Sequence, residues 1–114
     1  MLGDITAVDE IYIVCGRTDM RKSIDGLCAV IKDKLHMDPE KSVLYLFCGR
    51  RADRIKALLK EPDGFVLLYK RLSVAEGRYR WPRNESEAKK ITWKQFDWLM
   101  SGLEIEQKGA IKNL

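Results

Sequence analysis

The stretch VLYLFC, residues Val43–Cys48, is apolar at every position. A half-exposed strand alternates apolar with polar residues, so an unbroken apolar run of this length predicts a strand covered on both faces. Asp38-Pro39 precedes the run, and the polar loop GRRAD, residues 49–53, follows it. We therefore expect Val43–Cys48 to be the central strand of a sheet.

Further apolar runs lie on both sides of this strand. IYIVC, residues 11–15, predicts a short strand before it. The runs 54–61 and 65–72 and the short piece GRYRW, residues 77–81, follow it through links too short for a parallel crossover, which needs about a dozen residues. The pattern predicts an α+β fold, with an antiparallel meander sheet of about four to five strands and two amphipathic helices.

Alternation along these runs separates two faces. If it is unbroken, one face holds Ile55, Ala57, Leu59, Phe65, Leu67, Tyr69, Tyr79 and Trp81. The opposite face holds the bases Arg54, Lys56, Lys60, Lys70, Arg78 and Arg80, with Leu58, Val66 and Leu68 between them. A basic and partly apolar face is rarely bare, so we expect a helix of this chain or a partner to cover its centre.

The first helix is predicted from Met20 to Leu35, where apolar residues recur at positions 20, 24, 27, 28, 31 and 35. Thr18 or Asp19 would cap it. Arg21 and Lys22 then fall in the first turn, where each cation costs about 0.3–1 kcal/mol against the helix dipole. Pairing with nearby acids would offset that cost; the alternative is that both cations contact a phosphate.

The second helix is predicted to begin at Thr92, which forms a capping-box pattern with Gln95. Gly102 is a plausible end. Trp98 lies off the apolar stripe, so it is either tucked under a neighbouring loop or an interface anchor. The stripe itself consists of Trp93, Phe96, Leu99, Met100 and Leu103.

The length of 114 residues is typical of one domain, which we assign to residues 1–114, with a core at about 11–105 and flexible terminal segments. No run approaches the roughly 18 apolar residues of a membrane span, and the N-terminal MLGDITAVDE does not resemble a signal peptide. We therefore expect a cytoplasmic protein with no membrane contact. Three cysteines in apolar runs, Cys15, Cys28 and Cys48, are expected to be reduced core residues.

Positive charge is concentrated in one segment. From Arg50 to Arg83, ten Lys or Arg residues stand against four Asp or Glu, whereas the rest of the chain holds eleven bases and thirteen acids. This asymmetry favours an acidic partner, most commonly nucleic acid. The alternative is a solvated Lys and Arg face.

No active-site motif is present. The chain lacks G-x-x-x-x-G-K-[ST], G-x-G-x-x-G and H-E-x-x-H patterns, and a single histidine, His36, with no C-x-x-C pair argues against zinc. Capping, ion pairing or turn formation can account for the acids near turns. We therefore expect no catalytic residue, no metal and no cofactor. The acids considered are Asp19, Asp25, Asp53 and Asp63.

Five sequence blocks occur in order: TDMRKSIDGL (18–27), GRRADRIKALL (49–59), DGFVLLYKRL (63–72), GRYRWP (77–82) and ITWKQFDWLMSGL (91–103). Together they resemble the TnpB-type accessory protein encoded by the second open reading frame of the insertion sequence 66 family of bacterial transposons. The resemblance covers about residues 11–105. Departures are Glu61-Pro62 in place of a frequent Trp-acid pair, a longer SVAE stretch, and Trp93 in place of a common proline.

The resemblance implies a small accessory protein needed for transposition, with the transposase and other accessory proteins of the element as partners. DNA cleavage and joining would belong to the separate transposase. In the first hypothesis, the chain binds DNA or a DNA–transposase complex through a basic sheet face and an arginine loop. The candidate residues are Arg17, Arg21, Lys22, Arg50, Arg51, Arg54, Lys56, Lys70, Arg71, Arg78 and Arg80.

In the second hypothesis, the chain docks on the transposase without touching DNA, through Leu58, Val66, Leu68 and Trp98. A third hypothesis, a small phosphate-handling enzyme, would require turnover that Asp19→Ala abolishes. For the first hypothesis, the decisive structural question is whether the blocks TDMRK and GRRADR lie on the same side of the fold.

Overall fold

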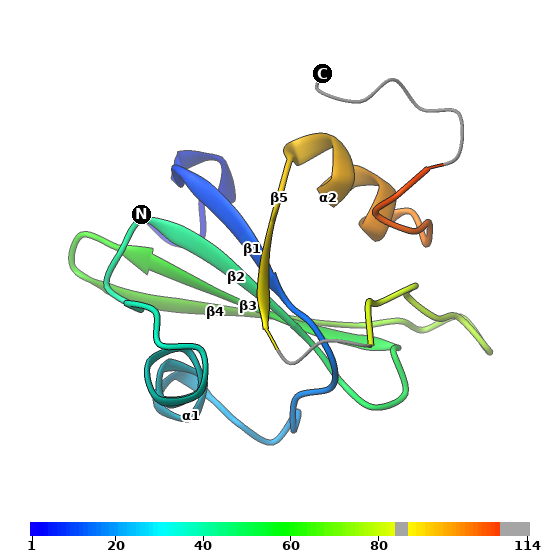
Figure 1. Cartoon of the computed structure of the whole chain (residues 1–114), viewed down its shortest axis with the longest axis horizontal. Helices are drawn as coiled ribbons and strands as arrows, with labels where there is room; N and C mark the ends of the chain where they lie inside the picture. Colours follow the sequence, from blue (N-terminus) through cyan, green and yellow to red (C-terminus); the bar gives the residue numbers. More distant parts are fainter. Residues whose placement is uncertain (84–86, 108–114) are drawn as a thin grey trace.

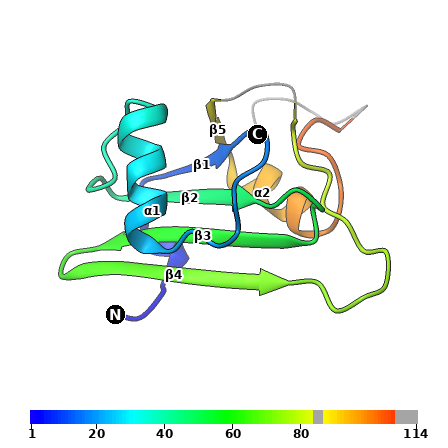
Figure 2. The same ribbon diagram turned by 90° about the horizontal axis from the view of Figure 1, so that it is seen from below.

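The computed structural model describes residues 1–83 and 87–107, and these form one mixed sheet with a helix on each face (Figures 1 and 2). The strands are β1 (Glu10–Val14), β2 (Val43–Cys48), β3 (Arg54–Glu61), β4 (Gly64–Arg71) and β5 (Ala88–Ile91). The helical segments are η1 (Ile5–Ala7, a 3-10 turn), α1 (Ile24–Ala29), η2 (Val30–Lys34, a π-helical continuation of α1) and α2 (Trp93–Met100).

Strand β2 is the central strand, as its sequence predicts. All six of its residues are buried. Tyr45 and Phe47 face a core cluster that contains Leu27 and Ile31 of the α1–η2 helix. Leu44, Leu46 and Cys48 face a second cluster that contains Leu99 of α2. Burial on both faces explains why the run shows no polar alternation.

The sheet is not an antiparallel meander throughout, because its order is β4-β3-β2-β1-β5. Strands β2, β3 and β4 are antiparallel neighbours, but β1 runs parallel to β2. The 28 residues between β1 and β2 contain α1 and are long enough for a parallel crossover. The GRYRW piece, residues 77–81, is not a strand, and the fifth strand is β5, which pairs antiparallel with β1.

The predicted division of residues between the two faces of the sheet is wrong for β4. The tight turn at Pro62-Asp63 pairs Glu61 with Gly64, so Leu58 pairs with Leu67. The prediction assumes that odd-numbered residues of both strands share one face. Directly opposed residues share a face, and the two-residue turn places each odd-numbered residue of β4 opposite an even-numbered residue of β3. Phe65, Leu67 and Tyr69 consequently lie on the α1 face, whereas Tyr79 and Trp81 do join the α2-side cluster.

Helix α1 begins later than its apolar stripe predicts. Its N-cap is Ser23, and capping by Thr18 or Asp19 is not observed. The Asp19 carboxylate instead accepts a hydrogen bond from the backbone N–H of Arg21, which closes a local turn. Arg21 and Lys22 therefore precede the helix, and the dipole cost expected for a first-turn cation does not arise.

Helix α2 has the predicted capping box, in which Thr92 and Gln95 each accept from the other's backbone N–H. Leu99 is fully buried and Gly102 follows the helix with a φ of +82°. Trp98 is half-buried. The expectation of a flexible C-terminal segment falls in part on residues 108–114, which lie outside the described residues. Within residues 1–83 and 87–107, no helix has the length and apolar character to cross a bilayer.

Candidate nucleic-acid interface

One end of the sheet is formed by the C-terminal ends of β1, β2 and β4 and by the N-terminal ends of β3 and β5. We call this the basic end, because its described loops and strand ends carry ten bases against the four acids Asp19, Asp53, Glu76 and Glu87. The opposite end carries acids such as Asp9, Glu10, Glu40 and Asp63, and two of its lysines, Lys60 and Lys90, pair with Glu40 and Glu10. The ten bases are Arg17, Arg21, Lys22, Arg50, Arg51, Arg54, Arg71, Arg78, Arg80 and Arg83.

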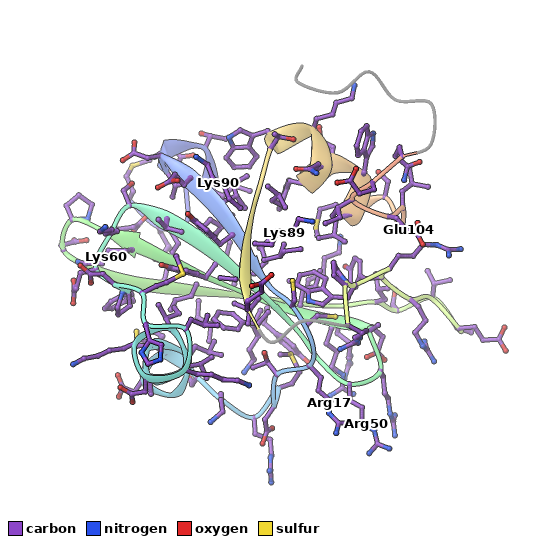
Figure 3. The ribbon with its side chains drawn as sticks, in the orientation of Figure 1. Arg17, Arg50, Lys60, Lys89, Lys90 and Glu104 are labelled. Carbon is purple, nitrogen blue, oxygen red and sulfur yellow. The ribbon has the colours of Figure 1, made fainter. Side chains whose placement is uncertain are left out.

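The TDMRK and GRRADR blocks lie together at the basic end. They line one open cleft of about 760 Å³ that includes Arg17, Arg21, Arg50, Arg51 and Arg54, and we call it the basic cleft. In Figure 3, Arg17 and Arg50 project from the same corner of the molecule, far from Lys60 at the other end of the sheet. A backbone hydrogen bond of 2.9 Å from the N–H of Thr18 to the carbonyl of Cys48 joins the two loops.

The two loops meet closely because position 49 has no side chain. A Cβ atom at Gly49 would lie 2.7 Å from Cγ of Met20, closer than real Cβ contacts allow. On the other side, Gly16, two residues after β1, has a φ of +78°, a conformation that glycine adopts without strain. These two glycines let the loop after β1 turn back against the arginine loop between β2 and β3.

A third segment supports the cleft from behind. Arg83 Nη2 donates a hydrogen bond of 2.7 Å to the carbonyl of Gly49 and contacts the carbonyl of Arg50 at 3.4 Å. The backbone N–H of Tyr79 donates to the carbonyl of Ala52 at 2.6 Å. Trp81 Nε1 donates to the carbonyl at the end of β1. Sequence reasoning did not single out Arg83; its only signal was its place as the last base of the charged segment.

Two of the five arginines that line the basic cleft have acidic partners. Arg21 binds the Asp19 carboxylate with an Nη2–Oδ2 distance of 2.8 Å, so the expected pairing with a nearby acid is present, although it offsets no helix-dipole cost. Hydrogen bonds and charge from Arg21 hold the pKa of Asp19 well below its usual range. Arg54 Nε lies 3.7 Å from Asp53 Oδ1. Arg17, Arg50 and Arg51 make no ion pair with any acid among the described residues.

The other predicted bases do not share one face of the sheet. Lys56 lies on the α1 face, where its Nζ donates to the carbonyl of Lys22 at 2.5 Å and sits 5.5 Å from the Tyr69 ring centroid. Lys70 points to the α2 face, since it pairs with Ile55. Arg71 lies opposite Arg54 in the register, and Arg78 and Arg80 are exposed. Most of the predicted bases therefore lie at the same end of the sheet and not on the same face.

The four residues predicted as a partner interface do not form one surface. Leu58 is only 1% exposed and packs in the cluster beneath α1, so its prediction as an interface residue is wrong. Val66 and Leu68 lie on the opposite face, where Val66 packs against the core and Leu68 is exposed. Trp98 is half-buried on α2.

The cysteines are free thiols, and Cys15 and Cys48 are buried. Burial raises the pKa of the Cys48 thiol to about 11 and also raises that of Cys28, so neither is an activated nucleophile. The part of the chain that the structure describes holds no group of three or more His, Cys, Asp or Glu residues able to bind a metal ion. His36 is exposed after η2, with a φ of +55°.

The fold and its charges define a small α+β protein that gathers positive charge at one end of a mixed sheet. Residues 9–110 match the family described as IS66 Orf2 like protein, and the chain belongs to this family of transposition-associated accessory proteins. This finding confirms the resemblance carried by the five sequence blocks.

Two relatives come from Sinorhizobium fredii, and both are described only as uncharacterized proteins. The chain is 32% identical to y4hO over 94 residues, which cover 82% of this chain and 80% of that protein. It is 26% identical to y4jC over 94 residues, with 82% and 79% covered. No solved structure shows a significant match.

Proposed function

We propose that this accessory protein is a non-catalytic subunit that binds the sugar-phosphate backbone of DNA at its basic end during transposition. The observation that carries the proposal is the convergence of Arg17, Arg50 and Arg51 on one open cleft without acidic partners among the described residues. Unpaired guanidinium groups are planar forks that bind phosphate oxygens in a bidentate manner.

The geometry of the cleft favours backbone contacts over base reading. Among the described residues, its lining contains arginines, small polar residues and Met20, but no aromatic side chain on which a base could stack. A hydrogen bond from Thr18 to Cys48 joins the two loops, and one from Arg83 to Gly49 holds the arginine loop. This pre-ordering lowers the conformational entropy that the loops would lose on binding. Such a site would bind duplexes of different sequence with similar affinity and strong salt dependence.

A fluorescence-anisotropy titration tests this proposal, with a transposon-end duplex and a scrambled duplex of equal length at several salt concentrations. The double variant Arg50→Ala/Arg51→Ala should lose about tenfold or more in affinity, and its log–log salt slope should fall by about 1.8 for two lost phosphate contacts. Lys41→Ala/Lys94→Ala is the matched control, because it removes the same charge from exposed sites away from the cleft.

Equal losses in the two double variants would show that only net charge matters and would remove the cleft from the proposal. Negligible affinity of the wild-type protein at low salt would refute DNA binding by this chain alone.

A second candidate function is docking on the transposase of the same element. Helix α2 favours it, because Trp93 at its start and Leu103 just beyond its end are exposed and Trp98 is only half-buried. Co-purification with the transposase, before and after nuclease treatment, separates the two functions. A complex that survives nuclease and is lost in Trp93→Ala supports docking, whereas loss upon nuclease treatment supports a DNA bridge.

A further inference from the structure

The edge of the sheet formed by β4 differs from the opposite edge. Strand β5 has only four residues and exposes Lys89 and Lys90, two features that protect a sheet edge from pairing with another chain. Strand β4 has eight residues and, within residues 1–83 and 87–107, pairs only with β3. Figure 2 shows β4 as the outermost strand, with the N-terminus of the chain beside it.

The backbone of β4 alternates between β3 and the outer edge. The N–H of Leu72, just beyond β4, donates to the carbonyl of Asp53, just before β3. Backbone groups of an antiparallel strand change direction with every residue, so the even-numbered residues of β4 bond to β3. The N–H and C=O groups of Phe65, Leu67, Tyr69 and Arg71 therefore point outward, where another strand could pair with them.

Exposed apolar side chains collect at this edge. Leu68 is 38% exposed and Tyr69 51% exposed, and both lie on β4. Met1 and Leu2 are 86% and 90% exposed, and the next residue, Gly3, lies against Leu68 and Val66. The N–H of Gly3 donates to the Glu61 carboxylate at 3.0 Å, which anchors this segment beside the edge. Four of the seven large apolar residues exposed in the described chain thus border β4.

We infer that the β4 edge pairs with β4 of a second copy of this chain, antiparallel and centred on Leu67. In this register Phe65 lies opposite Tyr69 of the second copy and Val66 lies opposite its Leu68. Asp63, in the turn just before the strand, lies opposite Arg71 of the second copy. Aromatic, aliphatic and opposite-charge pairs are the three kinds of cross-strand pair that stabilise an antiparallel sheet.

The register is consistent with both the backbone and the faces. It pairs odd-numbered residues with odd-numbered ones, so the outward N–H and C=O groups of Phe65, Leu67 and Tyr69 meet their counterparts. It also keeps each face continuous, with α1 of both copies on one side of a joined sheet. The charges are complementary because the acid lies before β4 and Lys70 and Arg71 lie at its end.

The interface does not depend on the proposed function, but it has a consequence for it. An antiparallel β4–β4 pair places the basic ends of the two copies at opposite ends of the joined sheet. A dimer would therefore present two basic clefts, each accessible from its own end, in place of one continuous basic surface.

Sedimentation equilibrium or light scattering of the purified protein tests the inference. We expect a mass of twice 13.2 kDa at micromolar to submillimolar concentration. Asp63→Arg or Arg71→Asp places like charges opposite each other twice per dimer and should raise the dissociation constant about tenfold. The double variant Asp63→Arg/Arg71→Asp restores opposite-charge pairs and should restore the dimer.

A backbone variant tests the same interface independently. Tyr69→Pro removes an outward N–H, and proline is tolerated on an edge strand where the N–H does not bond within the sheet. It should give a folded monomer by circular dichroism, whereas Tyr69→Phe should remain dimeric. A wild-type monomer throughout the concentration range would overturn the inference. So would a dimer that neither single charge reversal weakens.

Discussion

Arg83 donates a hydrogen bond of 2.7 Å from Nη2 to the carbonyl oxygen of Gly49, across 34 positions of sequence. This bond joins the segment before β5 to the arginine loop. We predict that Arg83→Ala weakens DNA binding about tenfold, because it removes a charge and also releases the loop that carries Arg50 and Arg51.

Arg78→Ala is the control for that prediction. Arg78 is exposed at the same end of the sheet, but within the described part of the chain its side chain donates only to the carbonyl of its neighbour Gly77. Arg78→Ala should lower the DNA affinity measured by anisotropy about twofold, as expected for the loss of one charge away from the basic cleft. If Arg78→Ala weakens binding as much as Arg83→Ala, Arg83 acts through its charge alone and has no positioning role.

The contact between Gly49 and Met20 gives a stability prediction. A methyl group at position 49 would come within 2.7 Å of Met20 Cγ, so Gly49→Ala should lower the free energy of unfolding by about 1–3 kcal/mol through overpacking. Urea denaturation measures the change. Gly64→Ala, whose added Cβ meets nothing within 4 Å, should cost much less, and Met20→Ala should partly rescue Gly49→Ala. Equal effects of the two glycine substitutions would contradict this account.

The sequence predicts elements whose pattern is local. The all-apolar run Val43–Cys48 can be buried only between two layers, and the Thr92–Gln95 capping box requires only one helical turn. The direction of β1 could not be inferred in the same way. A long link containing a helix permits either orientation of the next strand, so the position of β1 beside β2 depends on packing of α1 against Tyr45 and Phe47.

The face of β4 and the start of α1 show a second limit. The length of the turn at Pro62-Asp63 sets the register between β3 and β4. A shift of one residue in that register moves Phe65, Leu67 and Tyr69 to the other face of the sheet. The composition of the charged segment indicated a basic surface correctly, but not that it gathers at a sheet end. Arg83 was missed because its role depends on a contact with a carbonyl group, which leaves no trace in the sequence around it.

The buried tyrosine at the centre of β2 gives a pH-dependence. Burial raises the pKa of Tyr45 to about 12, against an ordinary value of 10. The folded state therefore keeps a proton that the unfolded chain loses, so stability is fully present below about pH 10 and falls as the pH rises through about 12. The loss should approach about 3 kcal/mol, at about 1.4 kcal/mol for each unit of the pKa difference. Tyr45→Phe should show a flatter decline between pH 10 and 12 in denaturation experiments; an unchanged slope would contradict this role.

Asp19 is the acid whose removal should improve the basic cleft. Its carboxylate engages Arg21 and places negative charge beside Arg17 and Arg50. Because its pKa lies well below the usual range, lowering the pH within the range that DNA tolerates does not neutralise it. Asp19→Asn removes this negative charge at any pH. The amide oxygen can still accept the hydrogen bond from the Arg21 N–H and preserve the turn.

We predict that Asp19→Asn raises DNA affinity about threefold at low salt and makes the salt dependence steeper, since Arg21 becomes available to a phosphate. Asp33→Asn on η2 is the control, because it removes the same charge from an exposed site outside the cleft and should change affinity much less. If Asp19→Asn binds DNA no better than this control while circular dichroism shows an intact fold, phosphate does not enter the basic cleft, and DNA binding would have to be assigned to another surface.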